Sequence, residues 1–320
     1  MRKIFSLLLS FFLFLLCVSP NATALSQKDV FSQKNATFGE IGVVLSGGGG
    51  KGAYEVGVWK AFVDYGIAQK VTVISGTSVG GLNAALFACE KVESVVGFWE
   101  NFVPEELWNN TYELIDEKGL ARIIDKVDLK KMQVNPYPKI YVTATRKRFA
   151  VAKLLAKIFL DADYSHRFLL NEESSIPEIK NLLLATSAFP IFTKAIELKD
   201  GYKYVDGGVC DNTPIEPLLY DENRENLSVI FVVHLGSDAE YSKRYENVVD
   251  IFPSRSLGGL DRMIDFSEST VKDLIELGYS DAVEAFESVC MRSVLDCLFD
   301  ESRYYPDENR SYPGEPEENF

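Results

Sequence analysis

The sequence has little of what marks nucleic-acid-binding or membrane-spanning proteins. Its 320 residues carry 33 Lys and Arg against 47 Asp and Glu, and this net charge of −14 argues against general attraction to nucleic acid. Only one long apolar run occurs, Ile4–Val18, and it falls short of the ~20 residues that span a bilayer. Histidine is scarce: His166 and His234 are the only two, which limits the candidates for a histidine base.

The apolar run has the flanks of a secretory signal peptide. Met1-Arg2-Lys3 gives it a basic start, and the small residues of Ala22-Thr23-Ala24 follow it. We therefore expect residues 1–24 to be removed and the protein to be exported, to the periplasm or the medium. Residues 301–320 are polar, acidic and contain proline, which predicts disorder. A single catalytic domain is expected over residues 25–300.

Cysteine spacing gives little support for a disulfide, although export would permit one. Four cysteines remain after the predicted cleavage: Cys89, Cys210, Cys290 and Cys297. On a continuous helix the last two would have α-carbons about 10 Å apart, which is too far to bridge. Free thiols are the favoured interpretation.

Predicted strands and helices alternate, which indicates the α/β class. The apolar segment 41–46 is followed by helical spacing over 53–65, a second strand over 71–75 and a second helix over 79–89. Such alternation is typical of a parallel sheet covered by helices. Further strands are predicted over 139–145, 202–205 and 229–235, and an amphipathic helix over 270–289.

A glycine-rich loop, Gly47 to Gly52, joins the first predicted strand to the first helix. It fits the dinucleotide pattern, but the second strand then ends without the carboxylate that would hold a ribose. A P-loop is excluded because Lys51 is followed by glycine rather than by serine or threonine. The backbone N–H groups of this loop are therefore expected to serve another negatively charged oxygen.

Two further motifs supply a nucleophile and a base. Gly76-Thr77-Ser78-Val79-Gly80 is a G-x-S-x-G pattern between a strand and a helix, the setting of a nucleophile elbow. Tyr204-Val205-Asp206-Gly207-Gly208 brings a carboxylate to the end of a strand, where it could activate the serine hydroxyl. The alternative base is His234, because Ser78, Asp206 and His234 follow the order of α/β-hydrolases. It lies in an apolar run, where a structural histidine is the more ordinary interpretation.

Together these motifs resemble the patatin-like phospholipases. The segments Ala185-Thr186-Ser187-Ala188-Phe189-Pro190 and Asp211-Asn212-x-Pro214-x-Glu216-Pro217-Leu218 are similar to the central block of that family. The resemblance covers most of residues 41–220, and Gly278-Tyr279-x-Asp281-Ala282 is similar to its C-terminal helix. It implies a three-layer α/β/α sandwich with a mainly parallel central sheet. It also implies hydrolysis of phospholipid or lysophospholipid acyl esters by a Ser–Asp dyad, without a metal or organic cofactor.

The resemblance assigns roles to individual residues. Ser78 would be the nucleophile and Asp206 the proton acceptor, and the backbone amides of Gly47, Gly48 and Gly49 would form the oxyanion hole. The supporting motif residues would be Lys51, Gly52, Gly76, Gly80, Gly207 and Gly208.

The sequence departs from the family pattern between Arg146 and Ile179. Lys153 and Lys157 are four residues apart and would share one face of an amphipathic helix, which could touch a membrane surface transiently. The more ordinary interpretation is a core helix with a solvated face. A catalytically inactive homologue that binds membranes is the remaining alternative for the whole protein.

Overall fold

The computed structural model describes residues 40–103, 117–135, 138–147, 164–190, 193–220, 227–236 and 240–299. The predicted signal peptide, the acidic tail and the pair Lys153 and Lys157 lie outside these ranges. Among the described helices, none is both long enough and apolar enough to cross a bilayer.

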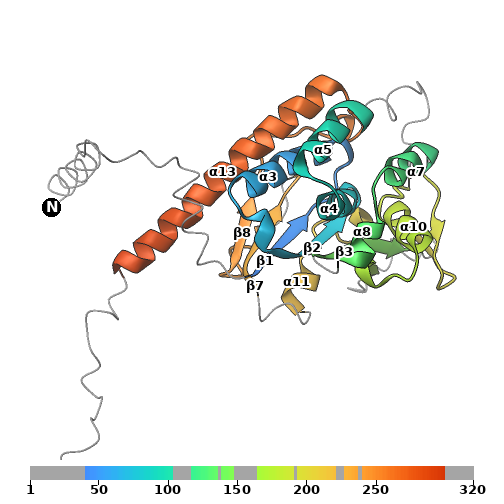
Figure 1. Cartoon of the computed structure of the whole chain (residues 1–320), viewed down its shortest axis with the longest axis horizontal. Coiled ribbons are helices and arrows are strands. Elements are labelled where there is room, and N and C mark those ends of the chain that lie inside the picture. The colour runs from blue at the N-terminus through green and yellow to red at the C-terminus, as the bar shows by residue number, and fades with distance from the viewer. Residues whose placement is uncertain are drawn as a thin grey trace, which may run out of the picture.

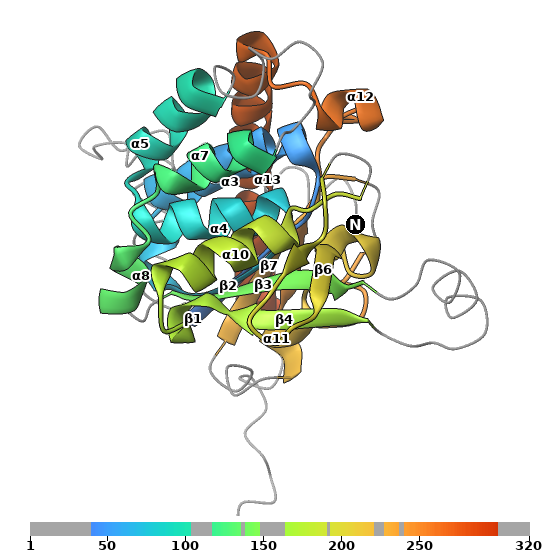
Figure 2. The same ribbon diagram turned by 90° about the vertical axis from the view of Figure 1, so that its right-hand side faces the viewer.

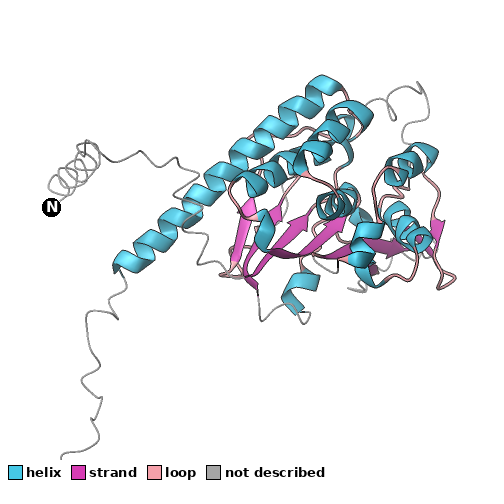
Figure 3. Cartoon of the chain, in the orientation of Figure 1, coloured by secondary structure: helices cyan, strands magenta, loops and turns pink. Residues whose placement is uncertain are grey.

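One mixed sheet forms the centre of the fold (Figures 1 and 3). Its strands are β1 (Glu40–Leu45), β2 (Val71–Thr77), β3 (Lys139–Arg146), β4 (Ser165–Leu169), β5 (Ile196–Glu197), β6 (Lys203–Asp206), β7 (Leu227–Val233) and β8 (Val248–Ile251). The order is β5-β6-β3-β2-β1-β7-β8, and β4 also pairs with β3. From β3 across β2, β1 and β7 to β8 every pairing is parallel, whereas β4, β5 and β6 pair antiparallel. The prediction of a mainly parallel sheet is confirmed.

Helices cover both faces of the sheet, in unequal layers (Figures 1 and 2). They are α3 (Ala53–Asp64), α4 (Val79–Cys89), α5 (Val92–Gly97), α7 (Glu117–Asp125), α8 (Lys130–Val134), α10 (Ile176–Thr186), α11 (Glu216–Tyr220), α12 (Leu260–Met263) and α13 (Glu268–Phe299). Helices α3, α4, α10 and α13 pack on one face, and α11 packs on the other. Side chains alternate along β1, so that Val43 and Leu45 join the first cluster while Val44 joins the second. The three-layer arrangement is confirmed.

The long helix α13 packs closely on α3 because both helices have a glycine at the contact. A Cβ on Gly57 would lie 2.0 Å from the carbonyl oxygen of Ile275, and one on Gly278 would lie 2.0 Å from that of Tyr54. The helix is longer than the predicted 270–289 and continues without a break past Cys290 and Cys297. The side chains of these two cysteines lie outside the described part.

Strand β3 changes its neighbour along one edge, and this change positions the candidate site. At Thr143 it pairs with Thr77 of β2 on one edge and with β4 on the other. At Ala144 it still pairs with β4, and its second partner is now Asp206 of β6. Strand β4 pairs with the same side of β3 at both residues. Strand β6 therefore lies on the other side of β3, directly beyond the point where β2 ends. Its antiparallel direction puts Asp206 next to the end of β2.

Candidate active site

Ser78 lies at the sharp turn between β2 and α4. Its backbone has φ 55° and ψ −124°, and among the described residues it is the only non-glycine with a positive φ. Holding a residue in such a conformation costs about 1–3 kcal/mol. A Cβ on Gly76 would lie 2.4 Å from the carbonyl carbon of Gly80, so a side chain at that position would block the turn. The glycines around Ser78 therefore permit the turn that presents its side chain to a pocket.

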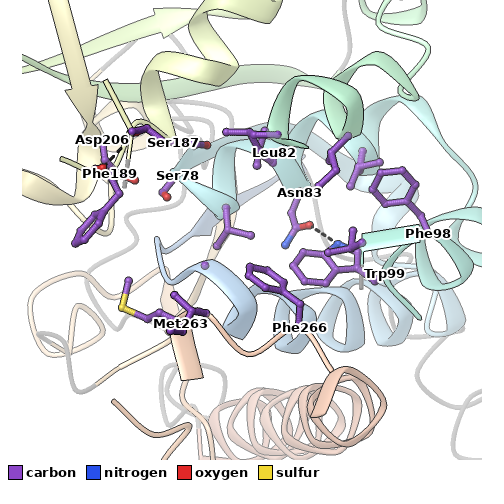
Figure 4. Close-up of a pocket in the computed structure, with 18 residues that line it drawn as sticks. Ser78, Leu82, Asn83, Phe98, Trp99, Ser187, Phe189, Asp206, Met263 and Phe266 are labelled. Carbon is purple, nitrogen blue, oxygen red and sulfur yellow. Dashed lines mark hydrogen bonds between the residues drawn. The ribbon is translucent and has the colours of Figure 1, made fainter. Parts of the chain in front are cut away.

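Asp206 ends β6 and lies beside Ser78 (Figure 4). Asp206 is 4% exposed, and the nearby Ser78 hydroxyl favours the charged form of its carboxylate. The backbone N–H of Gly208 donates a hydrogen bond to Oδ1, with a donor–acceptor distance of 2.7 Å. The structure thus brings together the hydroxyl and the carboxylate that the sequence analysis selected from distant motifs.

The burial of the Asp206 carboxylate shifts its pKa. Burial raises the pKa of Asp206 to about 6, because the charged form loses contact with water. The Ser78 hydroxyl and the Gly208 backbone N–H favour the charged form and act in the opposite direction. A carboxylate with this pKa is ionised at neutral pH and remains basic enough to accept a proton, as general-base catalysis requires.

Helix α10 and the residues after it hold both reacting groups in place. The backbone N–H of Ser78 donates to Oγ1 of Thr186 at 2.9 Å, and Thr186 in turn donates to the carbonyl of Thr143. The backbone N–H of Asp206 donates to the carbonyl of Ala188 at 2.9 Å. No single motif in the sequence predicts a role for these residues. The available signal was their place in the 185–190 segment of the resemblance.

The glycine-rich loop lies against Ser78, but its three predicted oxyanion donors are not equivalent. The N–H of Gly47 donates to the backbone carbonyl of Asn212 at 3.0 Å, and Nδ2 of Asn212 donates back to the Gly47 carbonyl at 3.2 Å. Within the described residues, no acceptor is bound by the N–H groups of Gly48 and Gly49. The loop therefore offers these two donors rather than three.

The far side of the same loop is held by the segment around α12. Gly49 has φ 58°, and a Cβ there would lie 2.2 Å from the carbonyl oxygen of Met263. Lys51 is largely buried, and its Nζ donates to the carbonyl of Gly258 at 2.6 Å. Lys51 thus braces the loop and is not among the residues that line the pocket. The remaining motif glycines lie at close contacts in these turns: Gly52, Gly80, Gly207 and Gly208.

An apolar pocket extends from Ser78 and Asp206 between the helices (Figure 4). Its wall includes the side chains of Leu82, Leu86, Phe98, Trp99, Leu120 and Ile123. The polar side chain of Asn83 also lines the pocket, but its amide is already hydrogen-bonded within the protein. In Figure 4, Ser78 and Asp206 lie at one end of the pocket and Phe98 and Trp99 at the other. The site combines a hydroxyl–carboxylate pair with an apolar binding surface.

His234 belongs to a different cluster. Its Nε2 lies 2.7 Å from Oδ1 of Asp250, and its ring stacks on Phe252 with a centroid distance of 4.0 Å. It is fully buried at the end of β7 and is not among the residues that line the pocket. The partner of His234 in the fold is therefore Asp250, whereas Asp206 lies beside Ser78 at the pocket.

We expect His234→Gln to leave ester hydrolysis within about threefold of wild type, because the histidine touches neither Ser78 nor the pocket. It should lower the free energy of unfolding by about 1 kcal/mol, since the glutamine amide can replace the hydrogen bond to Asp250 but not the stacking of the ring on Phe252. Steady-state kinetics on a soluble ester and urea denaturation measure the two effects. A loss of more than 100-fold in kcat by a folded variant would favour a Ser–Asp–His mechanism.

Comparison with known proteins gives one family match and several partial relatives. A family model described as patatin-like phospholipase matches residues 43–219, more than half of the chain. The chain is 26% identical over 218 residues to lysophospholipase NTE1 of Mycosarcoma maydis, and 48% identical over 48 residues to lysophospholipase nte1 of Aspergillus terreus. These alignments cover 64% and 15% of this chain but 10% and 3% of the relatives. The chain therefore spans a tenth or less of the length of these relatives.

Solved structures show a more distant likeness. VipD from Legionella pneumophila is 14% identical with a TM-score of 0.46, over 78% of this chain and 67% of that one. The heterodimeric ExoU–SpcU complex from Pseudomonas aeruginosa gives 19% identity and a TM-score of 0.43, over 78% of this chain and 51% of that one. These values are too low to support a residue-by-residue comparison.

Proposed function

The chain belongs to the patatin-like phospholipase family, and from that premise we propose that it is a lipid acyl hydrolase acting on phospholipids or lysophospholipids. The observation that carries the proposal is the placement of the Ser78 hydroxyl beside the buried Asp206 carboxylate at one end of an apolar pocket. A hydroxyl becomes an effective nucleophile when an adjacent base takes its proton. An apolar wall beside it suits the acyl chain of a lipid.

In the proposed reaction, Oγ of Ser78 attacks the ester carbonyl while Asp206 accepts the hydroxyl proton. The carbonyl oxygen becomes an oxyanion, which the backbone N–H groups of Gly48 and Gly49 stabilise. Asp206 then gives its proton to the departing alcohol, and the acyl group remains bound to Ser78. Water, deprotonated by Asp206, attacks this acyl-enzyme, and release of the fatty acid restores the serine hydroxyl.

The local hydrogen bonds support the assignment of the oxyanion to the amides of Gly48 and Gly49. Thr186 takes up the backbone N–H of Ser78, so that this amide is not available to the substrate oxygen. The backbone N–H of Gly47 is also unavailable, because it donates to the backbone carbonyl of Asn212. The amides of Gly48 and Gly49 are the candidates that remain on the loop, and Gly49 lines the pocket together with Ser78.

The two alternatives have less support. A Ser–Asp–His hydrolase would need His234 near Ser78, whereas His234 is paired with Asp250. A catalytically inactive membrane-binding homologue would not need the strained Ser78 backbone or the buried Asp206 beside it. Retention of this strain favours an enzyme, because strained residues concentrate at functional sites.

Two further parts of the proposal rest on sequence alone. Export by residues 1–24 follows from the order of basic, apolar and small residues. Transient membrane contact through Lys153 and Lys157 follows from their helical spacing. Both segments lie outside the described residues.

Product analysis on one defined phospholipid tests the proposed reaction. The purified protein, incubated with a phosphatidylcholine that carries a different acyl chain at each position, should release free fatty acid and lysophospholipid or glycerophosphocholine. Mass spectrometry identifies which chain is released. Release of phosphocholine or phosphatidic acid instead would contradict acyl-ester cleavage, and Ser78→Ala provides the control for a contaminating lipase.

A further inference from the structure

Glu55 is a buried acid that the proposed reaction does not use. It lies in the first turn of α3, directly after the glycine-rich loop, and is 0% exposed. It is not among the residues that line the pocket. Its Oε1 has no hydrogen-bond partner within the described residues. Burying a carboxyl group with so few partners is costly, so its presence calls for an explanation.

The second carboxyl oxygen of Glu55 connects two elements of the active site. Nδ2 of Asn83 donates to Oε2 of Glu55 at 2.8 Å and to the carbonyl oxygen of Gly52 at 3.0 Å. Gly52 ends the glycine-rich loop, and Asn83 lies on α4, the helix that begins directly after Ser78. Through these two bonds, Asn83 on the helix of the nucleophile holds both the end of the loop and Glu55 at the start of α3.

The same amide reaches the pocket wall. Nε1 of Trp99 donates to Oδ1 of Asn83 at 3.0 Å, as Figure 4 shows. Both N–H bonds and the carbonyl of the Asn83 side chain are therefore used, and its orientation is fixed. Asn83 has a single orientation that can satisfy Glu55, Gly52 and Trp99 together. A change at Glu55 would free one of its donors.

The environment of Glu55 favours its neutral form. Burial raises the pKa of Glu55 well above its ordinary value, against weaker opposing effects of the Asn83 side-chain amide and the Ser46 backbone amide. The Ser46 amide is itself hydrogen-bonded to the carbonyl of Val233. Ser46 immediately precedes the glycine-rich loop, so Glu55 interacts near both ends of the loop, with Ser46 at one end and through Asn83 with Gly52 at the other.

We propose that Glu55 is a positioning residue that acts through Asn83 to hold the glycine-rich loop at a fixed distance from Ser78. This inference rests on the proposed function, because the loop amides are the oxyanion donors of that reaction. A fixed loop matters because donors stabilise an oxyanion only when they already lie where its charge develops. A displacement of about 1 Å can cost ~10²-fold in rate.

Two substitutions separate positioning from simple filling of the core. Glu55→Gln is neutral, has the same shape and keeps an acceptor oxygen for Asn83. Glu55→Met has a similar length but offers no acceptor. Each variant is assayed with p-nitrophenyl butyrate for kcat and KM, by thermal denaturation for folding, and by hydrogen–deuterium exchange over residues 46–58.

For Glu55→Gln we expect kcat and loop exchange close to those of wild type. For Glu55→Met we expect about tenfold faster exchange in the loop, since a local restraint on its opening is lost. Its kcat should fall about 10²-fold, with KM within about threefold, because the loss affects the transition state more than the ground state. A residue that only fills the core would lower the melting temperature and leave kcat of the folded fraction unchanged.

The outcomes that would overturn the inference are specific. Unchanged loop exchange and kcat in folded Glu55→Met would do so, as would large losses of both in folded Glu55→Gln. Should Glu55→Met fail to fold, Glu55→Asp takes its place, because its carboxyl group is one methylene too short to reach Asn83. If wild type hydrolyses no ester, the proposed function fails, while the exchange data still decide whether Glu55 restrains the loop.

Discussion

Replacing Ser78 with alanine should abolish ester hydrolysis, with a fall in kcat/KM of about 10³–10⁶-fold. The hydroxyl is the only nucleophile in the proposed reaction, and the Asp206 carboxylate beside it is the candidate base. The residual rate would come from binding and the loop amides alone. Kinetics on a soluble ester and covalent labelling by a fluorophosphonate probe measure the effect, and labelling should be lost completely.

Ser75→Ala is the matched control for this substitution. Ser75 is also a buried serine of β2, and its Oγ has no hydrogen-bond partner in the described part of the chain. It does not line the pocket, so the same chemical change should leave kcat within about twofold and stability nearly unchanged. Full activity in a folded Ser78→Ala variant would refute the proposed mechanism.

Replacing Asp206 with asparagine should lower kcat by about 10²–10⁴-fold, the usual contribution of a general base. Asparagine has the same shape and can still accept the Gly208 N–H, but it cannot take the Ser78 proton. The pH profile gives a second test. Because the pKa of Asp206 is about 6, wild-type kcat/KM should fall about tenfold per pH unit below pH 6 and level off above it. The residual activity of Asp206→Asn should not show this fall below pH 6.

Asp206→Asn should lower activity but raise the stability of the folded protein above pH 6. The folded-state pKa of Asp206, about 6, lies above the ordinary 3.8, so folding favours the protonated form. Its contribution to stability is fully present below pH 3.8 and is lost as the pH rises through 6. At pH 8 the buried, charged carboxylate lowers the free energy of unfolding by up to ~3 kcal/mol, since the two pKa values differ by 2.2 and each pKa unit corresponds to ~1.36 kcal/mol. Asp206→Asn would remove this cost.

Urea denaturation at pH 4 and pH 8 tests this prediction, and Asp200→Asn is the control. Asp200 precedes the same strand and accepts hydrogen bonds from Tyr202 and Tyr204, but it lies outside the pocket. It should leave kcat unchanged. A pH-independent stability difference for Asp206→Asn would contradict the raised pKa, and retained activity would remove Asp206 from the mechanism.

Local features of the site could be predicted because short-range geometry produces them. The turn at Ser78 follows from Gly76 and Gly80, which leave room for a positive φ between a strand and a helix. The bare backbone of the glycine-rich loop could also be predicted, because it is the run of glycines from Gly47 to Gly50 itself. Each of these conclusions needs only neighbours in the chain.

Other features of the site depend on which strand pairs with which. Strand β4 was not predicted, although its place on one edge of β3 leaves the other edge to β2 and β6. His234 and Asp250 also come together only through adjacent parallel strands, β7 and β8. Sequence order alone made His234 a candidate base, and the fold gave it another partner.

The sequence by itself determined the α/β class, the sharp turn at Ser78 and the bare backbone of the glycine-rich loop, because each depends on residue type and short spacing. Only the tertiary structure decided that Asp206 lies beside Ser78, that the Gly47 N–H donates to the carbonyl of Asn212, and that Asn83 connects Glu55 to the end of the loop. These contacts join residues far apart in the chain. Their formation depends on the sheet order and on packing between helices, which no local pattern encodes.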